Sequence, residues 1–374
     1  MKLFADINTL DKEKDTYEKS YISAIKKYPY IYLWGISESC DEAIAFFKKH
    51  NITIKGIYNI NSKIYNYSYM DIPVVEESFD NIDTTAAIVT TNSYYETFRE
   101  RLLKKYPNID SNLFVFDGYF LENKNTDYYI ENKDVITKCY KALKDDYSKE
   151  LYDALLRYRY IRDPNIIKNL YESRSNCYLD DVFINTYKDG LYIDVGSYNA
   201  DFITTLKKKV DISKSKFYIF EPNKTFYKRI INNLDKDINY KAYNMALCDK
   251  KGEMEFMSLA FSTSHIVDKK YNAYKDNYNN NIVKVNTDTL DAIIKDEKVT
   301  GIKIDIEGAE SSMLIGAKKT IKRDRPIILL AIYHRWDDMF KLQDYLMSLD
   351  LNYKFYIRHY SLGVSKTVLY CIPE

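Results

Sequence analysis

The stretch LYIDVGSYNAD, residues 191–201, decides the fold of this chain, together with FYIFEPN at residues 217–223. Each is a short apolar run, rich in β-branched and aromatic residues, that ends in an acidic residue and a turn former. Buried parallel strands have this pattern, and they deliver polar side chains to the carboxyl edge of their sheet. The two runs therefore predict neighbouring parallel strands with a nucleotide-type crevice at their common edge.

The residues at this edge suit a ligand that has a ribose but no phosphate. Gly196 permits a close approach of the backbone after the first strand, and Glu221 follows the second strand, where it can accept hydrogen bonds from ribose hydroxyls. A dinucleotide site would show the further glycines of G-x-G-x-x-G, which this turn lacks. With Asp194 closing the first strand, we expect S-adenosylmethionine as the cofactor.

Length and composition narrow the class of protein. The 374 residues are enough for two domains, and 55 basic against 54 acidic residues give no electrostatic reason to expect nucleic acid as a partner. The five cysteines contain no C-x-x-C pair, which argues against a zinc cluster or a disulfide framework. No signal peptide or transmembrane segment is evident. We expect a soluble, cytoplasmic protein, and its oligomeric state stays open, a homo-oligomer included.

Residues 1–120 alternate strand-like runs with helical patterns, which predicts a small Rossmann-like α/β domain. Strands are expected at residues 30–35, 52–58, 72–75, 86–91 and 113–116, and helices at 41–50 and 94–106. The first turn, GISES at residues 35–39, lacks the glycines of a nucleotide-binding turn, and Glu38 would repel a phosphate. We therefore favour a structural or substrate-presenting role for this domain. Residues 121–189 predict a helical connector, with an amphipathic helix at 135–159.

The second domain, residues 190–374, is expected to be a larger doubly wound sheet. A helix at residues 224–234 leads to a third strand at 240–247, whose end commonly lies near an adenine in such folds. Strands at 252–256 and 282–286 flank a polar segment, residues 262–281, that contains His265. Because long loops inside compact domains are often functional, we expect part of the substrate-side wall there.

The decapeptide GIKIDIEGAE, residues 301–310, is the most informative in the chain. Period-2 alternation places Lys303, Asp305 and Glu307 on one face of a strand, before a helix at 309–321 with Glu310 in its first turn. Charges on a central strand are costly unless they pair or meet a ligand. A structural alternative is that Lys303 pairs with Asp305 and that Glu310 only complements the helix dipole.

In order and spacing, several motifs resemble the FkbM-type methyltransferase family. They are DVG at 194–196, FEPN at 220–223, MALCD at 245–249, VNTDTLD at 285–291 and KIDIEGAE at 303–310. The resemblance covers residues 190 to about 335, and Tyr333-His334 with Arg358-His359 resembles a bacterial branch of the family. It implies a class I, S-adenosylmethionine-dependent methyltransferase acting on hydroxyl groups, often of sugars in surface polysaccharides. Ala200 stands where the family usually has Gly, and Tyr198 where it often has Asn.

The resulting site predictions fall into two sets of binding residues. The cofactor-binding set comprises Asp194, Gly196, Ser197, Tyr198, Glu221, Pro222, Ala246 and Asp305. The substrate-binding set comprises Lys303, Glu307, Glu310, His265 and Arg358, for a small-molecule sugar or glycan acceptor.

Methyl transfer to a hydroxyl also requires that the acceptor oxygen be aligned and lose its proton. His334 follows the apolar run 327–333 and is the first candidate base, because an unperturbed pKa of about 6.5 suits proton acceptance near neutrality. His359 is the second candidate and Asp305 completes the catalytic set, although each histidine also fits a structural role. Alternatively, Asp305, Glu307 and Asp337 gather a divalent cation.

Two rival functions stay open. One is an NAD(P)-dependent oxidoreductase that uses the N-terminal domain. The other is a sugar-nucleotide-binding module that also uses the N-terminal domain. In both cases the C-terminal domain would be non-catalytic.

Overall fold

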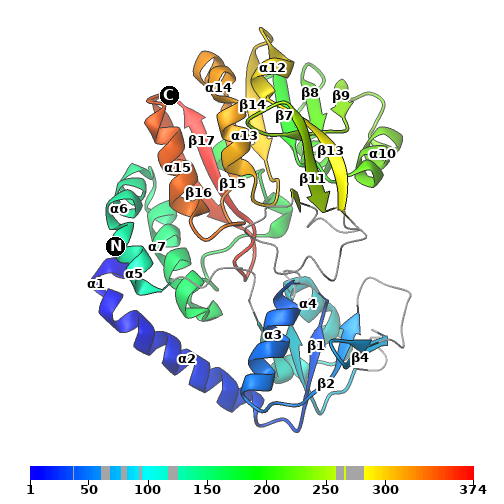
Figure 1. The fold of residues 1–374 in the computed structure, drawn as a ribbon, viewed down its shortest axis with the longest axis vertical. Coiled ribbons are helices and arrows are strands. Elements are labelled where there is room, and N and C mark those ends of the chain that lie inside the picture. Colours follow the sequence, from blue (N-terminus) through cyan, green and yellow to red (C-terminus); the bar gives the residue numbers. More distant parts are fainter. Residues whose placement is uncertain are drawn as a thin grey trace. The chain divides into compact units, whose positions relative to one another are not determined.

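The computed structural model divides into two compact units (Figure 1). It describes residues 1–36, 38–59, 68–76, 82–91, 95–116, 125–257, 265–266 and 282–374. The first unit comprises residues 1–131, 151–172 and 360–365, and the second comprises residues 132–150, 173–359 and 366–374. The predicted domain boundaries at residues 120 and 189 stay a prediction.

The first unit is built on a six-stranded sheet in the order β3-β4-β2-β1-β5-β6. Its strands are β1 (Ile31–Trp34), β2 (Ile54–Asn59), β3 (Ser68–Tyr69), β4 (Ile72–Glu76), β5 (Ala87–Thr90) and β6 (Leu113–Val115). All neighbours pair in parallel except β3 and β4, which form an antiparallel pair. Its helices are α1 (Lys2–Ala5), α2 (Leu10–Ile25), α3 (Glu38–Lys49), α4 (Tyr95–Lys105) and α5 (Thr126–Glu131).

Alternation along β1 determines how this sheet is covered. Ile31 and Leu33 pack with Phe47 of α3 in one hydrophobic cluster, whereas Trp34 packs with Phe98 and Leu102 of α4 in another. Because successive strand residues point to opposite faces, these two clusters lie on opposite sides of the sheet. Helices therefore cover both faces, as expected for a parallel sheet.

The second unit contains a seven-stranded sheet in the order β16-β17-β15-β14-β7-β8-β9. Its strands are β7 (Leu191–Val195), β8 (Lys216–Phe220), β9 (Tyr240–Tyr243), β14 (Val299–Ile304), β15 (Ile327–Ala331), β16 (Tyr353–His359) and β17 (Thr367–Pro373). Pairing is parallel throughout except at β17, which is antiparallel to β15 and β16. The carboxyl ends of β7, β8, β14 and β15 therefore meet at one edge.

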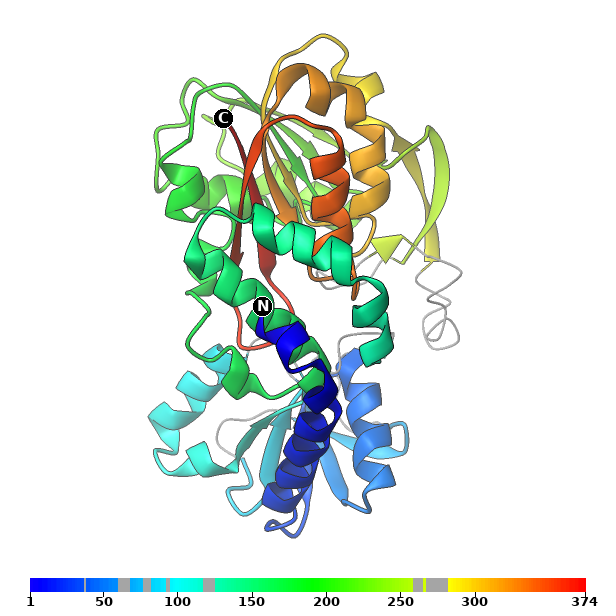
Figure 2. The same ribbon diagram turned by 90° about the vertical axis from the view of Figure 1, so that its left-hand side faces the viewer.

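Helices and a small second sheet complete this unit. The helices are α6 (Lys133–Ala142), α8 (Asp181–Ile184), α9 (Asp201–Leu206), α10 (Lys224–Asn233), α12 (Leu290–Ile294), α13 (Glu310–Gly316), α14 (Lys318–Asp324) and α15 (Asp338–Ser348), and α7 (Asp146–Ile161) belongs to both units. Figure 2 shows the orange helices α13, α14 and α15 together on one face of the large sheet. The small sheet has the order β10-β13-β11-β12, with β10 (Ala246–Leu247), β11 (Gly252–Met257), β12 (His265–Ile266) and β13 (Ile282–Asp288).

The α/β class with mainly parallel sheets is confirmed, but three predicted elements are wrong in extent. The helix expected at 135–159 is two helices, α6 and α7, because Leu143 is extended and bridges to Phe355. The strand expected at 240–247 is two strands in different sheets, β9 and β10, and between them the Asn244 side chain donates to the carbonyls of Glu221 and Pro222. The helix expected at 309–321 breaks at Ala317 into α13 and α14.

The strand within the decapeptide also ends earlier than the alternation of apolar and charged residues predicts. β14 stops at Ile304, and Glu307 has a left-handed backbone with φ 53°. Lys303, Asp305 and Glu307 therefore do not share one strand face. Lys303 is on the strand, whereas the two acids lie on the turn that follows it.

Among the described residues, no helix combines the length and the apolar character that crossing a membrane requires.

Candidate active site

A small cavity lies at the carboxyl edge of the seven-stranded sheet. Seven sequence-predicted residues line it: Gly196, Tyr198, Glu221, Pro222, Ala246, Asp305 and Glu307. The rest of its wall is largely apolar and includes Phe226 and Phe256. The cavity measures about 50 Å³, whereas pockets for small molecules commonly measure about 300–1,000 Å³. A ligand of nucleoside size would therefore have to widen it.

Gly196 is required at the β7 turn for a different reason than predicted. Its φ is +74°, and a Cβ placed on it would lie 1.9 Å from the carbonyl oxygen of Asp305. The turn after β14 therefore packs directly against the backbone of Gly196. Lack of a side chain here lets the two turns pack together.

The two positions at which this turn departs from the family pattern both have left-handed backbones. Tyr198 has φ 55° and Ala200 has φ 60°. Asn and Gly adopt this region more readily than Tyr and Ala do. Asn and Gly would thus suit the left-handed backbone of these two positions better than the residues present. Instead, Tyr198 places an aromatic ring against Phe226, with ring centroids 4.5 Å apart.

Glu221 is fixed at the end of β8 by backbone donors. The Tyr198 N–H donates to its Oε2 (2.9 Å) and the Asn223 N–H to its Oε1 (2.8 Å). Its side chain is nearly fully buried, and this burial raises the pKa of Glu221 to about 7. A carboxylate can accept about four hydrogen bonds, so each oxygen retains capacity toward the cavity.

Asp194 and Lys303 form a buried ion pair behind the cavity. They occupy the same register position on β7 and β14, with Lys303 Nζ 3.1 Å from Asp194 Oδ1. Lys303 also donates to the carbonyl of Gly196 (2.6 Å), and Ser197 Oγ donates to Asp194 Oδ2 (2.5 Å). The structural alternative that paired Lys303 with Asp305 is wrong, because neighbouring parallel strands bring Lys303 to Asp194. Neither Asp194, Ser197 nor Lys303 lines the cavity.

Asp305 is surrounded by polar partners on the turn after β14. The hydroxyl of Tyr333 donates to its Oδ1 (2.9 Å), and Lys366 Nζ lies 3.4 Å from its Oδ2. Burial opposes its ionisation, but the positive charges of Lys366, Lys303 and His334 hold the pKa of Asp305 well below its usual range. Asp305 is therefore a stable anion and a weak base.

His334 is almost completely buried among carboxylates. Its Nδ1–H donates to Glu310 Oε1 (2.8 Å), and its Nε2 lies 3.4 Å from Asp305 Oδ1 and 3.4 Å from Glu307 Oε2. Burial alone would lower the pKa of His334, but Glu310 and Glu307 raise it well above the usual value. The pKa of His334 thus differs from the unperturbed value on which its choice as a base rested, and its role as a base stays a prediction.

Glu310 does more than complement the dipole of α13. It is buried, and its Oε1 also accepts from the backbone N–H of Ile306 (3.0 Å). Asp338 lies near the same histidine and accepts from the Arg335 N–H (2.6 Å), and its burial raises the pKa of Asp338 to about 7. Glu310 thus fixes the orientation of the His334 ring.

Three other predicted residues, Arg358, His359 and Asp337, do not line the cavity, and a fourth, His265, is described only in its backbone. Arg358 on β16 pairs with Asp145 and Asp180 (2.9 and 3.3 Å). His359 is fully buried and its Nδ1 hydrogen-bonds Thr367 Oγ1 (2.9 Å). Asp337 pairs with Lys341 and belongs to neither acid–histidine cluster found among the described residues. The backbone of His265 pairs with Met257, and the side chain of His265, like the rest of segment 262–281 apart from β12, lies outside the described residues.

Sequence reasoning missed three residues that the fold brings to this edge: Tyr333, Asp338 and Lys366. Tyr333 directly precedes the predicted His334 and Asp338 follows it by four residues, so their position after a buried strand was an available signal. Lys366 lies just before β17, and Lys366 Nζ donates to the Tyr333 hydroxyl (2.9 Å). No pattern in the sequence connects Lys366 to the KIDIEGAE motif.

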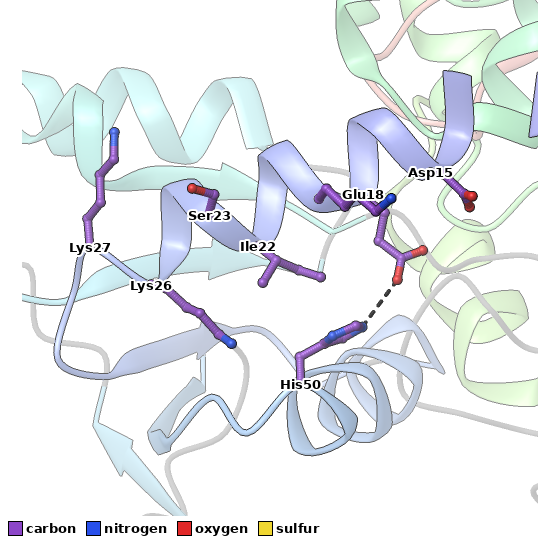
Figure 3. A pocket seen from close by; sticks show the side chains of 8 residues that line it. Asp15, Glu18, Ile22, Ser23, Lys26, Lys27 and His50 are labelled. Carbon is purple, nitrogen blue, oxygen red and sulfur yellow. Dashed lines mark ion pairs between the residues drawn. The ribbon is translucent and has the colours of Figure 1, made fainter. Parts of the chain in front are cut away.

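A larger hollow of about 620 Å³ lies in the first unit, along α2 and beside His50 (Figure 3). Its labelled side chains carry charges of both signs, and His50 pairs with Glu18 (3.2 Å). None of the sequence-predicted site residues lines it. We therefore place the candidate site at the smaller cavity of the second unit.

Comparisons with known proteins show what the chain is similar to. Residues 194–355 match the family described as Methyltransferase FkbM domain. The crystal structure of the methyltransferase FkbM from Methylobacillus flagellatus KT superposes with a TM-score of 0.59 at 15% identity, over 98% of this chain and 100% of that chain. At this identity the likeness shows the fold alone.

Two further solved structures have lower TM-scores. Aeropyrum pernix fibrillarin with natively bound S-adenosyl-L-methionine gives a TM-score of 0.33 at 11% identity, over 53% of this chain and 76% of that chain. Precorrin-6y C5,15-methyltransferase from Geobacter metallireducens GS-15 gives a TM-score of 0.30 at 10% identity, over 55% of this chain and 94% of that chain. Both superpose too loosely to support a conclusion. No curated protein matches the chain.

The predicted class I methyltransferase fold is confirmed, and residues 194–355 match the FkbM methyltransferase domain.

Proposed function

We propose that the protein is an S-adenosylmethionine-dependent O-methyltransferase that acts on a hydroxyl of a sugar or glycan precursor. The observation that carries this proposal is the position of Glu221. Its carboxylate follows β8, is oriented by two backbone N–H groups, and lines the same cavity as the β7 turn. An acid at this point of a doubly wound sheet is suited to bind the two hydroxyls of a ribose.

The cavity residues fit the remaining parts of this cofactor. Apolar side chains from β10 and its surroundings, with Ala246 and Phe256 among them, would contact the adenine. Gly196 and Tyr198 on the β7 turn would lie toward the methionine end. Because the cavity is small, binding would require movement in its wall, and the aromatic contact between Tyr198 and Phe226 is the part of the wall that we expect to shift.

The acceptor would bind beside Asp305 and Glu307, which line the cavity at the end of β14. S-adenosylmethionine would supply an activated methyl group on a cationic sulfur and leave as S-adenosylhomocysteine, while the proton of the acceptor hydroxyl would pass to solvent water. Carboxylate oxygens accept hydrogen bonds only, which suits a polyhydroxyl acceptor. Asp305 would orient the reacting hydroxyl in line with the donor, and His334 would hold Asp305 and Glu307 in place.

For the first unit we propose a Rossmann-like fold with a structural or substrate-presenting role. Its parallel sheet supports the fold, and the glycine-poor turn after β1 supports the role. Residue 37 of this turn lies outside the described residues. A cytoplasmic location and a role in polysaccharide formation belong to the same proposal.

The test is binding followed by turnover. Isothermal titration calorimetry of the purified protein with S-adenosylhomocysteine should give one site per chain, and NADH or NADPH should give none. Glu221→Gln should weaken this binding strongly, whereas Glu297→Gln, which alters an exposed acid paired with Lys216, should leave it unchanged. Incubation with methyl-labelled S-adenosylmethionine and a panel of cell-envelope sugar precursors should then show a mass gain of one methyl group. Tight binding of NADH with no binding of S-adenosylhomocysteine would overturn the proposal.

A further inference from the structure

We propose that Asp305, Glu307 and His334 form a binding site for one divalent cation at the edge of the cavity. One ligand atom from each side chain lies within 4.8 Å of the others. Within this group, His334 Nε2 is 3.4 Å from Asp305 Oδ1 and 3.4 Å from Glu307 Oε2. The three atoms thus converge on one point between the turn after β14 and the end of β15.

The buried Nε2 atom of His334 is the observation that points to a ligand. The His334 side chain is 2% exposed, and its Nε2 forms only long ion pairs of 3.4 Å with Asp305 and Glu307, without a hydrogen bond of good geometry to a described residue. Buried polar atoms are nearly always satisfied, so an unsatisfied one calls for an explanation. A cation between Nε2 and the two carboxylates would satisfy all three groups at once.

Glu310 prepares His334 for this role. Its Oε1 accepts from His334 Nδ1–H (2.8 Å) and from the Ile306 N–H (3.0 Å), which ties the ring to the backbone that carries the other two ligands. With the hydrogen on Nδ1, the lone pair of a neutral imidazole is on Nε2. Metal-binding histidines commonly have this arrangement, in which a carboxylate fixes the ring and the tautomer.

The spacing and the ligand types indicate the kind of ion. Two ligands bonded at about 2.1 Å to one ion lie roughly 3.0–3.4 Å apart for octahedral to tetrahedral geometry, which the observed separations approach. One imidazole nitrogen with two carboxylate oxygens suits a transition ion such as Mn²⁺ better than Ca²⁺ or Mg²⁺, which prefer oxygen alone. The remaining coordination positions would be filled by water.

The role of the ion in methyl transfer rests on the proposed function, whereas the cation site itself does not. Asp305 and Glu307 also line the cavity, so an open coordination position would face the acceptor hydroxyl. A bound divalent cation lowers the pKa of a coordinated hydroxyl, which would then release its proton to solvent water before it attacks the methyl carbon. The ion would thus take the place of a protein base.

The test uses the full chain, treated with a chelator and then dialysed. Titration with Mn²⁺, followed by the loss of the free-ion electron paramagnetic resonance signal, should give one tight site per chain. His334→Gln and Glu307→Gln should each weaken Mn²⁺ binding at least about tenfold, and Glu310→Gln about 10–100-fold. Asp344→Asn removes an exposed acid that pairs with Lys138 and should leave the affinity unchanged.

The outcomes separate this inference from the proposed function. Absence of a stoichiometric Mn²⁺ site in the unaltered chain, or equal affinity in His334→Gln and Glu307→Gln, would overturn the cation site whether or not S-adenosylhomocysteine binds. In that case His334 is an imidazolium that bridges the acids. Binding of Mn²⁺ without binding of S-adenosylhomocysteine would retain the site and overturn the proposed function. Circular dichroism of each variant verifies that it is folded.

Discussion

Lys303 and Asp194 face each other on neighbouring parallel strands and form a buried ion pair, with Nζ and Oδ1 3.1 Å apart. The pair links β14 to β7, the two strands whose following turns carry Asp305 and Gly196. The same lysine also binds the carbonyl of Gly196. It therefore connects the motif KIDIEGAE to the motif DVG and positions both turns beside the cavity.

Loss of this lysine should destabilise the second unit. Lys303→Met would leave Asp194 buried without its cation, a change that typically costs about 3–5 kcal/mol. Urea unfolding followed by circular dichroism measures the effect. Lys207→Met, which removes an exposed lysine paired with Asp235 and Asp237, is the matched control and should shift the midpoint far less. Equal shifts in the two variants would show that the buried pair contributes little.

Binding of S-adenosylhomocysteine should strengthen as the pH rises through about 7. Burial raises the pKa of Glu221 to about 7, so a fraction of the free protein carries the neutral acid at neutral pH. Ribose hydroxyls donate best to the ionised carboxylate. If only that form binds, the affinity at pH 8 should be about tenfold higher than at pH 6. Calorimetry across this range is the measurement, and a flat profile would show that ionisation of Glu221 does not control binding.

Arg358 should prove structural and not substrate-binding. Its guanidinium is held by Asp145 and Asp180 and also donates to Ser148 Oγ (3.0 Å). Arg358→Met should therefore lower the free energy of unfolding by about 3 kcal/mol, because two acids lose their partner. KM for the acceptor, measured below the unfolding temperature, should stay the same. A large increase in KM with unchanged stability would restore Arg358 to the substrate site.

His359 should be dispensable for turnover. Its ring is fully buried and bonded to Thr367, and it does not line the cavity. His359→Gln should keep kcat within about threefold while lowering stability by about 1–2 kcal/mol through the altered hydrogen bond. Single-turnover assays with labelled cofactor test this. A loss of several orders of magnitude in a folded variant would identify His359 as catalytic after all.

Local patterns in the sequence were sufficient to predict the strands that form the site. The runs before Asp194, Glu221 and Asp305 are apolar and short, and each ends in an acid, so parallel pairing had to bring these ends to one edge. Glu221 and Asp305 do line one cavity, as predicted. The end of β14 was predicted less well, because alternation alone does not reveal that the left-handed backbone at Glu307 follows a strand that stops at Ile304.

The sequence by itself thus determined the α/β class, the order of the motifs and the residue types at the carboxyl edge, because these depend on hydrophobic periodicity and turn residues that act locally. Only the tertiary structure decided which charges meet. Strand register selected Asp194 for Lys303, packing against Asp305 made Gly196 necessary, and the approach of α13 placed Glu310 on His334. Such pairings depend on which segments distant in sequence become neighbours, and burial then sets the protonation of the groups that are brought together.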